Sequence, residues 1–295
     1  MLSAILFGVA AVALGGLHDP ATVTSLTTGY KFTEGPIWLA DGTLLFSDIP
    51  ANRIYTGTGK VFREPTGNSN GLTLDHEGRL IAAEHTGRRI SRTEKDGTIT
   101  VIADQYDGKK LNSPNDVVVR SDGVMFFTDP PYGLEGGIEN SALGFSGTYG
   151  VDPKTGTVTL VSKDFVKPNG LCLSPDEKTL YVADTEGAHE ASDILGDIMA
   201  YTLGEDGTYG NGRLLCHLPK PDGIKVDVKG NIWATCKEGV NVYSPDGKLL
   251  ESVKVPEEPK NCSFGGEDGK TLYITALTSV YTVQCNVEGV YPAKK

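Results

Sequence analysis

The octapeptide Lys220-Pro221-Asp222-Gly223-Ile224-Lys225-Val226-Asp227 shows the pattern on which the chain is built, a short polar motif followed by an apolar strand. The pattern occurs six times. The motifs begin at residues 34, 70, 115, 169, 222 and 261, at intervals of 36, 45, 54, 53 and 39 residues. Repeats of about 40 to 50 residues with strand-rich content are typical of a β-propeller, in which each repeat forms a four-stranded blade. The key position of each motif carries a side-chain oxygen, in Glu34, Asn70, Asn115, Asn169, Asp222 and Asn261.

Each motif is followed by the elements of one blade. The first strand ends at a tight turn, usually with the Gly or Asp that hairpins require, as in Asp41-Gly42 and Glu77-Gly78. Second strands are predicted at residues 43–47, 79–83, 124–128, 179–183, 231–235 and 271–275. Third strands are predicted at residues 53–56, 89–93, 147–151, 197–202, 240–243 and 279–283. Fourth strands are predicted in five repeats, at residues 60–63, 98–103, 157–162, 212–217 and 249–255.

The sixth repeat has no fourth strand of its own. The β-rich stretch at residues 21–27, before the first motif, is otherwise unassigned. We predict that it supplies the outer strand of the last blade, because joining the two ends leaves no open seam with unpaired strand edges. The sequence therefore predicts an all-β fold, a single six-bladed β-propeller of four antiparallel strands per blade over residues 18–295.

This topology brings the six polar motifs to one end of the central channel. The two longest connections between second and third strands, residues 130–146 and 185–196, should overhang that end. A ring of carboxylate and amide oxygens suits calcium, magnesium or manganese. Calcium is the first choice because amide oxygens fit its loose, high coordination, and magnesium, manganese and zinc are the alternatives. Asn and Asp before Gly usually only make turns, but six positions in phase favour a site.

The composition limits the function and location. A formal net charge of -11 without any Lys/Arg-rich run argues against nucleic-acid binding. Residues 1–17 are uncharged and apolar, too short for a typical membrane span, and are predicted to be a secretory signal. A secreted or periplasmic location follows, with a membrane anchor or a buried segment of a cytoplasmic protein as alternatives. The five cysteines form no C-x-x-C pair and are interpreted mainly as small buried residues. Nothing predicts the oligomeric state.

The chain resembles the senescence marker protein (regucalcin) and gluconolactonase family of six-bladed propellers, which is itself similar to diisopropyl-fluorophosphatase. The resemblance covers residues 22–285 and rests on six phrases: Glu34-Gly35-Pro36, Leu111-Asn112-Ser113-Pro114-Asn115-Asp116, Thr128-Asp129-Pro130-Pro131-Tyr132-Gly133, Pro168-Asn169-Gly170, Pro221-Asp222-Gly223 and Asn261-Cys262-Ser263-Phe264-Gly265-Gly266. Ser113 stands where the vertebrate lactonases carry a substrate-binding Arg, so microbial gluconolactonases are the closer likeness.

The resemblance implies a site. It assigns metal binding to Glu34, Asn115, Asn169 and Asp222, and leaves Asn70 and Asn261 either supporting these ligands or facing the substrate. It also makes Asp222 the general base or nucleophile, although a metal ligand would have a lowered pKa and be a weak base. His85, at the end of a second strand, is a candidate substrate contact that could also shuttle protons. Tyr132, in the long loop of the third repeat, is a candidate substrate contact.

The predicted function is a calcium-dependent lactonase that opens a small sugar lactone such as gluconolactone to the hydroxy acid. One alternative is a calcium-dependent phosphotriesterase-like hydrolase with the same ligands. Another is a non-catalytic propeller with a structural calcium, whose broad face binds a protein partner. Asp48, Asp129 and Asp184, which recur at second-strand ends, are interpreted as caps of loop backbone amides rather than as site residues.

Overall fold

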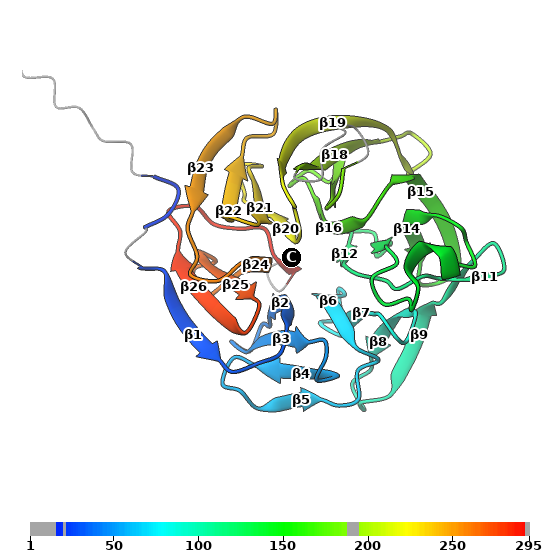
Figure 1. Cartoon of the computed structure of the whole chain (residues 1–295), viewed down its shortest axis with the longest axis horizontal. Helices are drawn as coiled ribbons and strands as arrows, with labels where there is room; N and C mark the ends of the chain where they lie inside the picture. Colours follow the sequence, from blue (N-terminus) through cyan, green and yellow to red (C-terminus); the bar gives the residue numbers. More distant parts are fainter. Residues whose placement is uncertain (1–15, 20–21, 188–194, 293–295) are drawn as a thin grey trace, which may run out of the picture.

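Six four-stranded antiparallel sheets surround a central axis like the blades of a propeller (Figure 1). The computed structural model describes residues 16–19, 22–187 and 195–292. In five of the sheets, four strands that follow one another in the sequence lie side by side in the same order. The predicted all-β, six-bladed fold is confirmed, and the predicted signal segment lies almost wholly outside the described residues.

The strands of the first three blades match the predicted strands to within a few residues. Blade one has β2 (Thr33–Trp38), β3 (Leu44–Asp48), β4 (Arg53–Thr56) and β5 (Val61–Arg63). Blade two has β6 (Ser69–Leu74), β7 (Leu80–Glu84), β8 (Arg89–Thr93) and β9 (Ile99–Ala103). Blade three has β12 (Val117–Val119), β13 (Met125–Asp129), β14 (Ser146–Asp152) and β15 (Thr157–Phe165).

The other three blades follow the same plan. Blade four has β16 (Pro168–Leu173), β17 (Thr179–Asp184), β18 (Leu195–Leu203) and β19 (Tyr209–Pro219). Blade five has β20 (Ile224–Val226), β21 (Ile232–Cys236), β22 (Gly239–Tyr243) and β23 (Leu249–Val253). Blade six has β24 (Pro259–Gly265), β25 (Thr271–Ala276) and β26 (Ser279–Gln284), and its outer strand is β1 (Thr24–Thr28).

Closure of the ring by β1 confirms the predicted outer strand. Strand β1 pairs antiparallel with β26, with Thr24 opposite Thr282 and Thr28 opposite Ser279. The hydroxyls of Thr24 and Thr282 lie 3.0 Å apart. The edge of β26 is therefore covered by a strand from the other end of the sequence.

Turn residues explain why each blade folds back where it does. In blade two the first turn contains Gly78 with a φ of 73°, a left-handed conformation that glycine adopts without strain. The corresponding turn in blade four lacks glycine, and Glu177 takes the left-handed conformation with a φ of 58°. Turn chemistry therefore fixes the hairpins in the order that the sequence pattern predicted.

The core lies between neighbouring blades rather than in the channel. One cluster joins Ile81 of blade two to Phe127 and Tyr149 of blade three, all with 0% exposure. Another joins Phe126 of blade three to Leu171 of blade four. Each such side chain contributes roughly 1.5–3 kcal/mol through burial. The blades hold one another in place, which fixes the positions of the inner strands.

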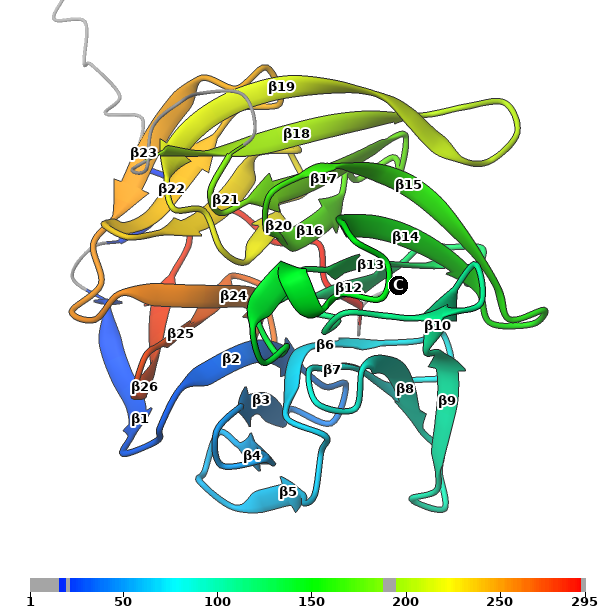
Figure 2. The same ribbon diagram turned by 45° about the vertical axis from the view of Figure 1, so that its right-hand side comes forward.

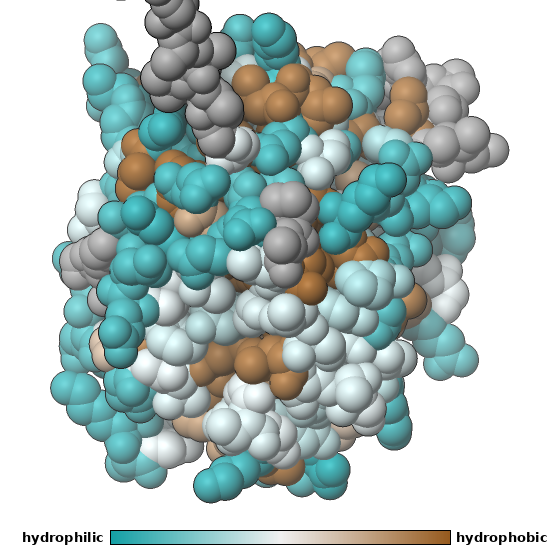
Figure 3. Space-filling view, turned by 90° about the vertical axis from the view of Figure 1, so that its left-hand side faces the viewer, coloured by the Kyte–Doolittle hydropathy of each residue, from teal (hydrophilic) through white to brown (hydrophobic). Residues whose placement is uncertain are grey.

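The outer strands carry the solvent-exposed surface. Figure 3 shows the side of the molecule that carries β1 and β23, where hydrophobic residues form small separate patches among polar ones. The exposed large hydrophobic residues include Leu26 on β1 and Leu249 and Leu250 on β23. Scattered exposure of this kind is ordinary for a globular protein.

A short hairpin and a 3₁₀ helix were not predicted. Strands β10 (Gln105–Tyr106) and β11 (Lys109–Lys110) form a hairpin after blade two. Asp107 and Gly108 connect them, both with positive φ, as a type I′ turn requires. The 3₁₀ helix η2 (Gly137–Asn140) lies in the long loop of blade three.

After β26 the chain crosses the end of the channel opposite the polar motifs. Val290 donates its backbone N–H to the carbonyl of Val226 at 2.9 Å, and Tyr291 is 7% exposed. This tail and the carboxyl-terminal halves of the inner strands enclose a cavity of about 60 Å³. Figure 1 shows the last described residues at the propeller axis. The tail closes that end, so the polar motifs are reached from the other.

The remaining expectations concern cysteines and membranes. All five cysteines are unpaired, and four of them are buried, so the interpretation as small buried residues is confirmed. Within the described residues, no helix is long and apolar enough to cross a membrane.

Candidate metal and active site

Glycines beside the key positions let neighbouring inner strands touch. A β-carbon added to Gly35 would lie only 2.0 Å from the carbonyl oxygen of Asn70 in the next blade. One added to Gly170 would lie 2.4 Å from the carbonyl oxygen of Asp222, to which Gly170 donates a hydrogen bond at 3.1 Å. No larger residue fits either contact without moving the backbone. The side chains before these glycines are thereby drawn together at one end of the channel.

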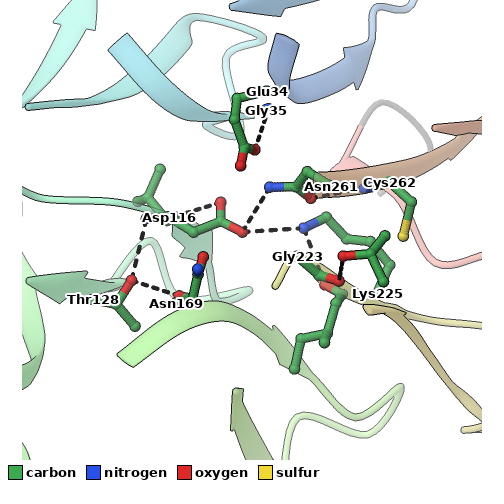
Figure 4. Close-up of polar contacts among 12 residues, drawn as sticks. Glu34, Gly35, Asp116, Thr128, Asn169, Gly223, Lys225, Asn261 and Cys262 are labelled. Atoms are coloured by element: carbon green, nitrogen blue, oxygen red, sulfur yellow. Dashed lines mark hydrogen bonds and ion pairs between the residues drawn. The ribbon is translucent and has the colours of Figure 1, made fainter. Parts of the chain in front are cut away.

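Three of the predicted ring members meet at the centre of this end. Oε2 of Glu34 accepts from the backbone N–H of Gly35 at 3.0 Å (Figure 4), and the side chain of Asn261 lies close enough to favour the ionised form of Glu34. The carboxylate of Asp222 is close enough to that of Glu34 to repel it. Two acidic groups therefore share a small, largely enclosed space.

The neutral ring members lie around this pair. Asn169 hydrogen bonds to Asp222, and its Nδ2 donates to Oγ1 of Thr185 at 3.0 Å. Asn115 is 3% exposed, and its backbone N–H donates to the carbonyl of Thr128 at 2.9 Å. All four residues assigned to the metal thus come from the starts of inner strands at the same end of the channel.

Asp116 is a central residue that the sequence analysis missed. It is 1% exposed, and its Oδ2 lies 3.4 Å from Nδ2 of Asn261 and 3.6 Å from Nζ of Lys225 (Figure 4). Its Oδ1 accepts from the backbone N–H of Val117 at 2.9 Å. Asp116 therefore adds a third carboxylate beneath the pair, and Lys225 is its cationic partner.

Burial dominates the electrostatics of the carboxylates. It raises the pKa of Asp222 to about 7, an effect that Lys260 opposes and the charge of Asp116 reinforces. Burial also holds the pKa of Glu34 well above its usual value, and the charge of Asp222 adds to this. A metal ligand was expected to have a lowered pKa, but burial acts on Asp222 in the opposite direction.

The donor set fits a hard cation. Within the described part of the chain, Oδ1 of Asp222 and Oδ1 of Asn70 are buried without a hydrogen-bond partner. Buried oxygens without partners are costly, and a cation would satisfy them. No group of three or more His, Cys, Asp or Glu side chains that could hold a metal is present in residues 16–19, 22–187 and 195–292. A cation here would depend on amide oxygens as well as carboxylates, which favours calcium.

Asn70 and His85 form a neighbouring polar pair. Nδ2 of Asn70 lies 3.2 Å from Nε2 of His85, which is 7% exposed. Burial lowers the pKa of His85 to about 4, so the imidazole is neutral at neutral pH. In this arrangement the Asn70 amide donates to the ring nitrogen, and Oδ1 of Asn70 is left for another partner.

Tyr132 extends from the long loop of blade three to the same region. Its hydroxyl hydrogen bonds to the side chains of Thr185 and Asn169, while Nζ of Lys167 lies 5.7 Å from its ring centroid. Tyr132 as a residue is 41% exposed, but its hydroxyl end is partly desolvated, which raises the pKa of the phenol, and the charge of Asp222 adds to the effect. All eight predicted site residues thus belong to one end of the channel, and their roles stay predictions.

The aspartates at second-strand ends cap backbone amides, as predicted. Asp48 accepts from the N–H groups of Lys31 and Phe32 at 3.0 and 3.1 Å, and Asp184 accepts from Val166 and Lys167 at 2.9 and 2.7 Å. Asp129 accepts from the N–H of Asn112 at 2.8 Å. These carboxylates fix the connections that lead into the inner strands.

Blade two has Glu84 at the equivalent place, where it holds arginines instead of amides. The carboxylate is fully buried, with Arg63 at 2.6 Å and Arg89 at 2.7 Å, and Ser91 donates to it at 2.6 Å. Glu84 directly precedes His85 in the sequence, so its buried contacts with Arg63 and Arg89 fix the backbone beside His85.

Comparison with known proteins points to one family. Residues 32–278 match the family described as SMP-30/Gluconolactonase/LRE-like region. The chain is 32% identical over 310 residues to the gluconolactonase of Zymomonas mobilis, covering 94% of this chain and 85% of that protein. It is 29% identical over 273 residues to pentonolactonase XacC of Haloferax volcanii, covering 86% of this chain and 84% of that protein.

A solved structure agrees with these sequence relatives. The gluconolactonase of Xanthomonas campestris has a TM-score of 0.80 and 32% sequence identity, and the match covers 89% of each chain. The fold, the family match and the sequence relatives are thus consistent with one another.

Proposed function

The chain belongs to the SMP-30/gluconolactonase/LRE-like family, and from this membership we propose that it hydrolyses a small sugar lactone in a calcium-dependent reaction. It is a lactone-hydrolysing enzyme, a hydrolase of carboxylic esters, as its named relatives are. The relatives include a gluconolactonase and a pentonolactonase, so a five- or six-carbon aldonolactone is the proposed substrate class.

The observation that carries the calcium proposal is the unpaired Oδ1 of Asp222. It lies in a site where the carboxylates of Glu34 and Asp222 repel each other. Two buried carboxylates without a cation are unfavourable, whereas one divalent cation would balance their charge. Glu34, Asn115, Asn169 and Asp222 are the proposed ligands. When bound, the cation would polarise the lactone carbonyl and stabilise the oxyanion formed as water adds.

Asp222 is the proposed general base. It takes a proton from the attacking water, whose oxygen forms a bond to the carbonyl carbon. The ring C–O bond then breaks, and the leaving alkoxide oxygen receives a proton from the Asp222 carboxyl, which gives the open hydroxy acid and restores the carboxylate. The hydrogen bond from Asn169 holds the Asp222 carboxylate in one orientation.

Asn70, Asn261, His85 and Tyr132 are the proposed substrate contacts. Oδ1 of Asn70 is buried without a partner, so it can accept a hydrogen bond from a sugar hydroxyl. His85 is neutral near pH 7, because burial lowers its pKa to about 4. Because Nε2 accepts from Asn70, the neutral ring can donate one hydrogen bond through Nδ1 without bringing a positive charge beside the cation.

Removal of calcium tests the proposal directly. Hydrolysis of glucono-1,5-lactone, followed with a pH indicator against the spontaneous rate, is expected to disappear after chelation and to return when calcium is added. A rate of hydrolysis that is unchanged by the chelator would contradict calcium dependence. Hydrolysis of phosphotriesters but of no lactone would contradict the proposed substrate class.

Calcium affinity is expected to depend on pH. A cation binds the ionised carboxylates, and because burial raises the Asp222 pKa to about 7, protons compete with calcium below that pH. From pH 8 to pH 6 the affinity should fall about tenfold for this one group, with proton release on binding. Isothermal titration calorimetry in buffers of different ionisation enthalpy measures both quantities.

The stability of the metal-free protein should change in the corresponding direction. Because folding raises the Asp222 pKa, this group favours the folded state fully below about pH 4, and that contribution is lost as the pH rises through about 7. Stabilisation by calcium should therefore be larger at pH 8 than at pH 6. Equal calcium affinity and no proton release across this range would contradict the assignment of Asp222 as a ligand.

A further inference from the structure

A groove of about 770 Å³ opens beside the candidate site, at the same end of the propeller. It lies between the long loop of blade three, which contains η2, and the start of blade four. Figure 2 shows the short helical turn η2, in green, standing forward of β12 and β13. The lining is mainly apolar and includes Pro131, Leu134, Ile138, Phe145, Phe165 and Val166.

Two apolar side chains of the groove are exposed to solvent, while Pro131 and Phe165 are buried. Among the described residues, Ile138 is 37% exposed and Val166 is 42% exposed. The polar groups at the edge, Lys167 and Glu186, form an ion pair with each other. Their charges offset, so the groove presents neither a strong positive nor a strong negative field to a ligand.

Tyr132 makes the groove continuous with the candidate site. Its side chain lines the groove, while its hydroxyl lies beside the side chains of Asn169 and Thr185. The hydroxyl is also near enough to Asp222 for that charge to raise the Tyr132 pKa. Lys167, which also lines the groove, lies two residues before Asn169. A ligand whose reactive group lies at Asp222 can therefore extend past Tyr132 into the groove without leaving the protein surface.

The loop that forms one wall is held in place. Oγ of Ser113 donates to the carbonyl of Pro130 at 2.6 Å and accepts from the N–H of Gly133 at 2.8 Å. A β-carbon on Gly133 would lie 2.9 Å from that of His85, so the loop packs directly against the polar end of the channel. The wall is preformed, which lowers the entropic cost of binding a substituent there.

We propose that this groove binds an apolar substituent, an alkyl chain or aryl group, carried by the lactone substrate. The inference rests on the proposed lactonase function and extends its substrate class beyond bare sugar lactones. The groove offers apolar and aromatic surface, with which the hydroxyl-covered carbons of an aldonolactone would make few favourable contacts. An alkyl group on the lactone ring carbon would bury its methylenes there.

A chain-length series tests the inference. Hydrolysis of γ-lactones from γ-valerolactone to γ-undecalactone is compared with that of glucono-1,5-lactone. In the wild type, kcat/KM is expected to rise about fourfold per added methylene. The variants Val166→Asp and Ile138→Asp place a charge in the groove, so the series should become flat while gluconolactone turnover is unchanged.

Val101→Asp is the matched control. Val101 is 47% exposed on the outer strand β9, away from the groove, so this variant should keep the steep series. Thermal melting confirms that all variants are folded.

Four other results of these experiments would contradict the proposal that the groove binds the substituent. If the wild type hydrolyses gluconolactone but shows no dependence on chain length, the groove does not bind the substituent, whereas the proposed function stands. A steep series that survives both aspartate variants places the alkyl chain elsewhere. A wild-type dimer that Val166→Asp dissociates, together with a flat series, assigns the groove to a second copy of the chain. Failure to hydrolyse any lactone overturns the proposed function and the inference together.

Discussion

Replacing Asp222 with asparagine is expected to lower kcat for gluconolactone hydrolysis by about 10³-fold at saturating calcium, since removal of a general base typically costs 10²- to 10⁴-fold. The amide has nearly the shape of the carboxylate and can still hydrogen bond to Asn169, so the fold should be preserved. It cannot take a proton from water, and it supplies no negative charge. Initial rates over a range of calcium concentrations measure the loss.

The same variant separates the two roles of Asp222. Loss of one of the two ring carboxylates should weaken calcium binding, which titration calorimetry detects without any turnover. If calcium saturates the variant and the rate stays low, the loss belongs to proton transfer. The control is Asp41→Asn, in an exposed turn where the side chain accepts the N–H of Thr43 at 3.0 Å. A variant at position 222 with wild-type kcat would contradict the proposed mechanism.

The largest expected effect on stability comes from Glu84→Ala. Glu84 is fully buried between Arg63, whose side chain is 10% exposed, and the more exposed Arg89. Removing the carboxylate leaves the Arg63 guanidinium buried without its counter-charge, at a cost of about 3–5 kcal/mol. Urea unfolding monitored by tryptophan fluorescence should show a lower midpoint and an unchanged slope.

Glu77→Ala is the matched control for Glu84→Ala. Glu77 is an acid in the same blade, 58% exposed and paired with Arg79 at 3.0 Å. Exposed pairs of this kind contribute about 0–1 kcal/mol, so the urea midpoint should hardly move. If the two variants have similar midpoints, the buried Glu84 ion pairs contribute no more to the free energy of unfolding than an exposed pair does.

The fold could be predicted from the sequence because six repeats show the same order of polar motif, strands and turns. The spacing of the motifs fixed the blades, and the turn residues fixed the hairpins within them. The unassigned strand before the first motif fixed the closure, since an open edge would be unfavourable. The tail beyond β26 was not predicted, because Val290 and Tyr291 belong to no repeat and their partners lie far away in the sequence.

Asp116 and Lys225 show where the prediction of the site was incomplete. In four motifs the residue after the key position is glycine, which permits close strand contact, but Asp116 and Cys262 replace it in the other two. That irregularity was the available signal for Asp116. Lys225 gave no such signal, since a lysine in a strand is usually exposed, and only the fold turns it toward a buried carboxylate.

The pairing of β1 with β26 has a consequence for the order of folding. During synthesis β1 leaves the ribosome first, but its partner is made more than 250 residues later, as the contact between Thr24 and Thr282 shows. Blade six therefore cannot be completed until β26 has been translated. Closing so long a loop is slow, and we expect blade six to be the last to fold. Once β1 is paired with β26, blade six has its full set of four strands and joins the two ends of the ring, so the native state should persist longer than its equilibrium stability alone implies.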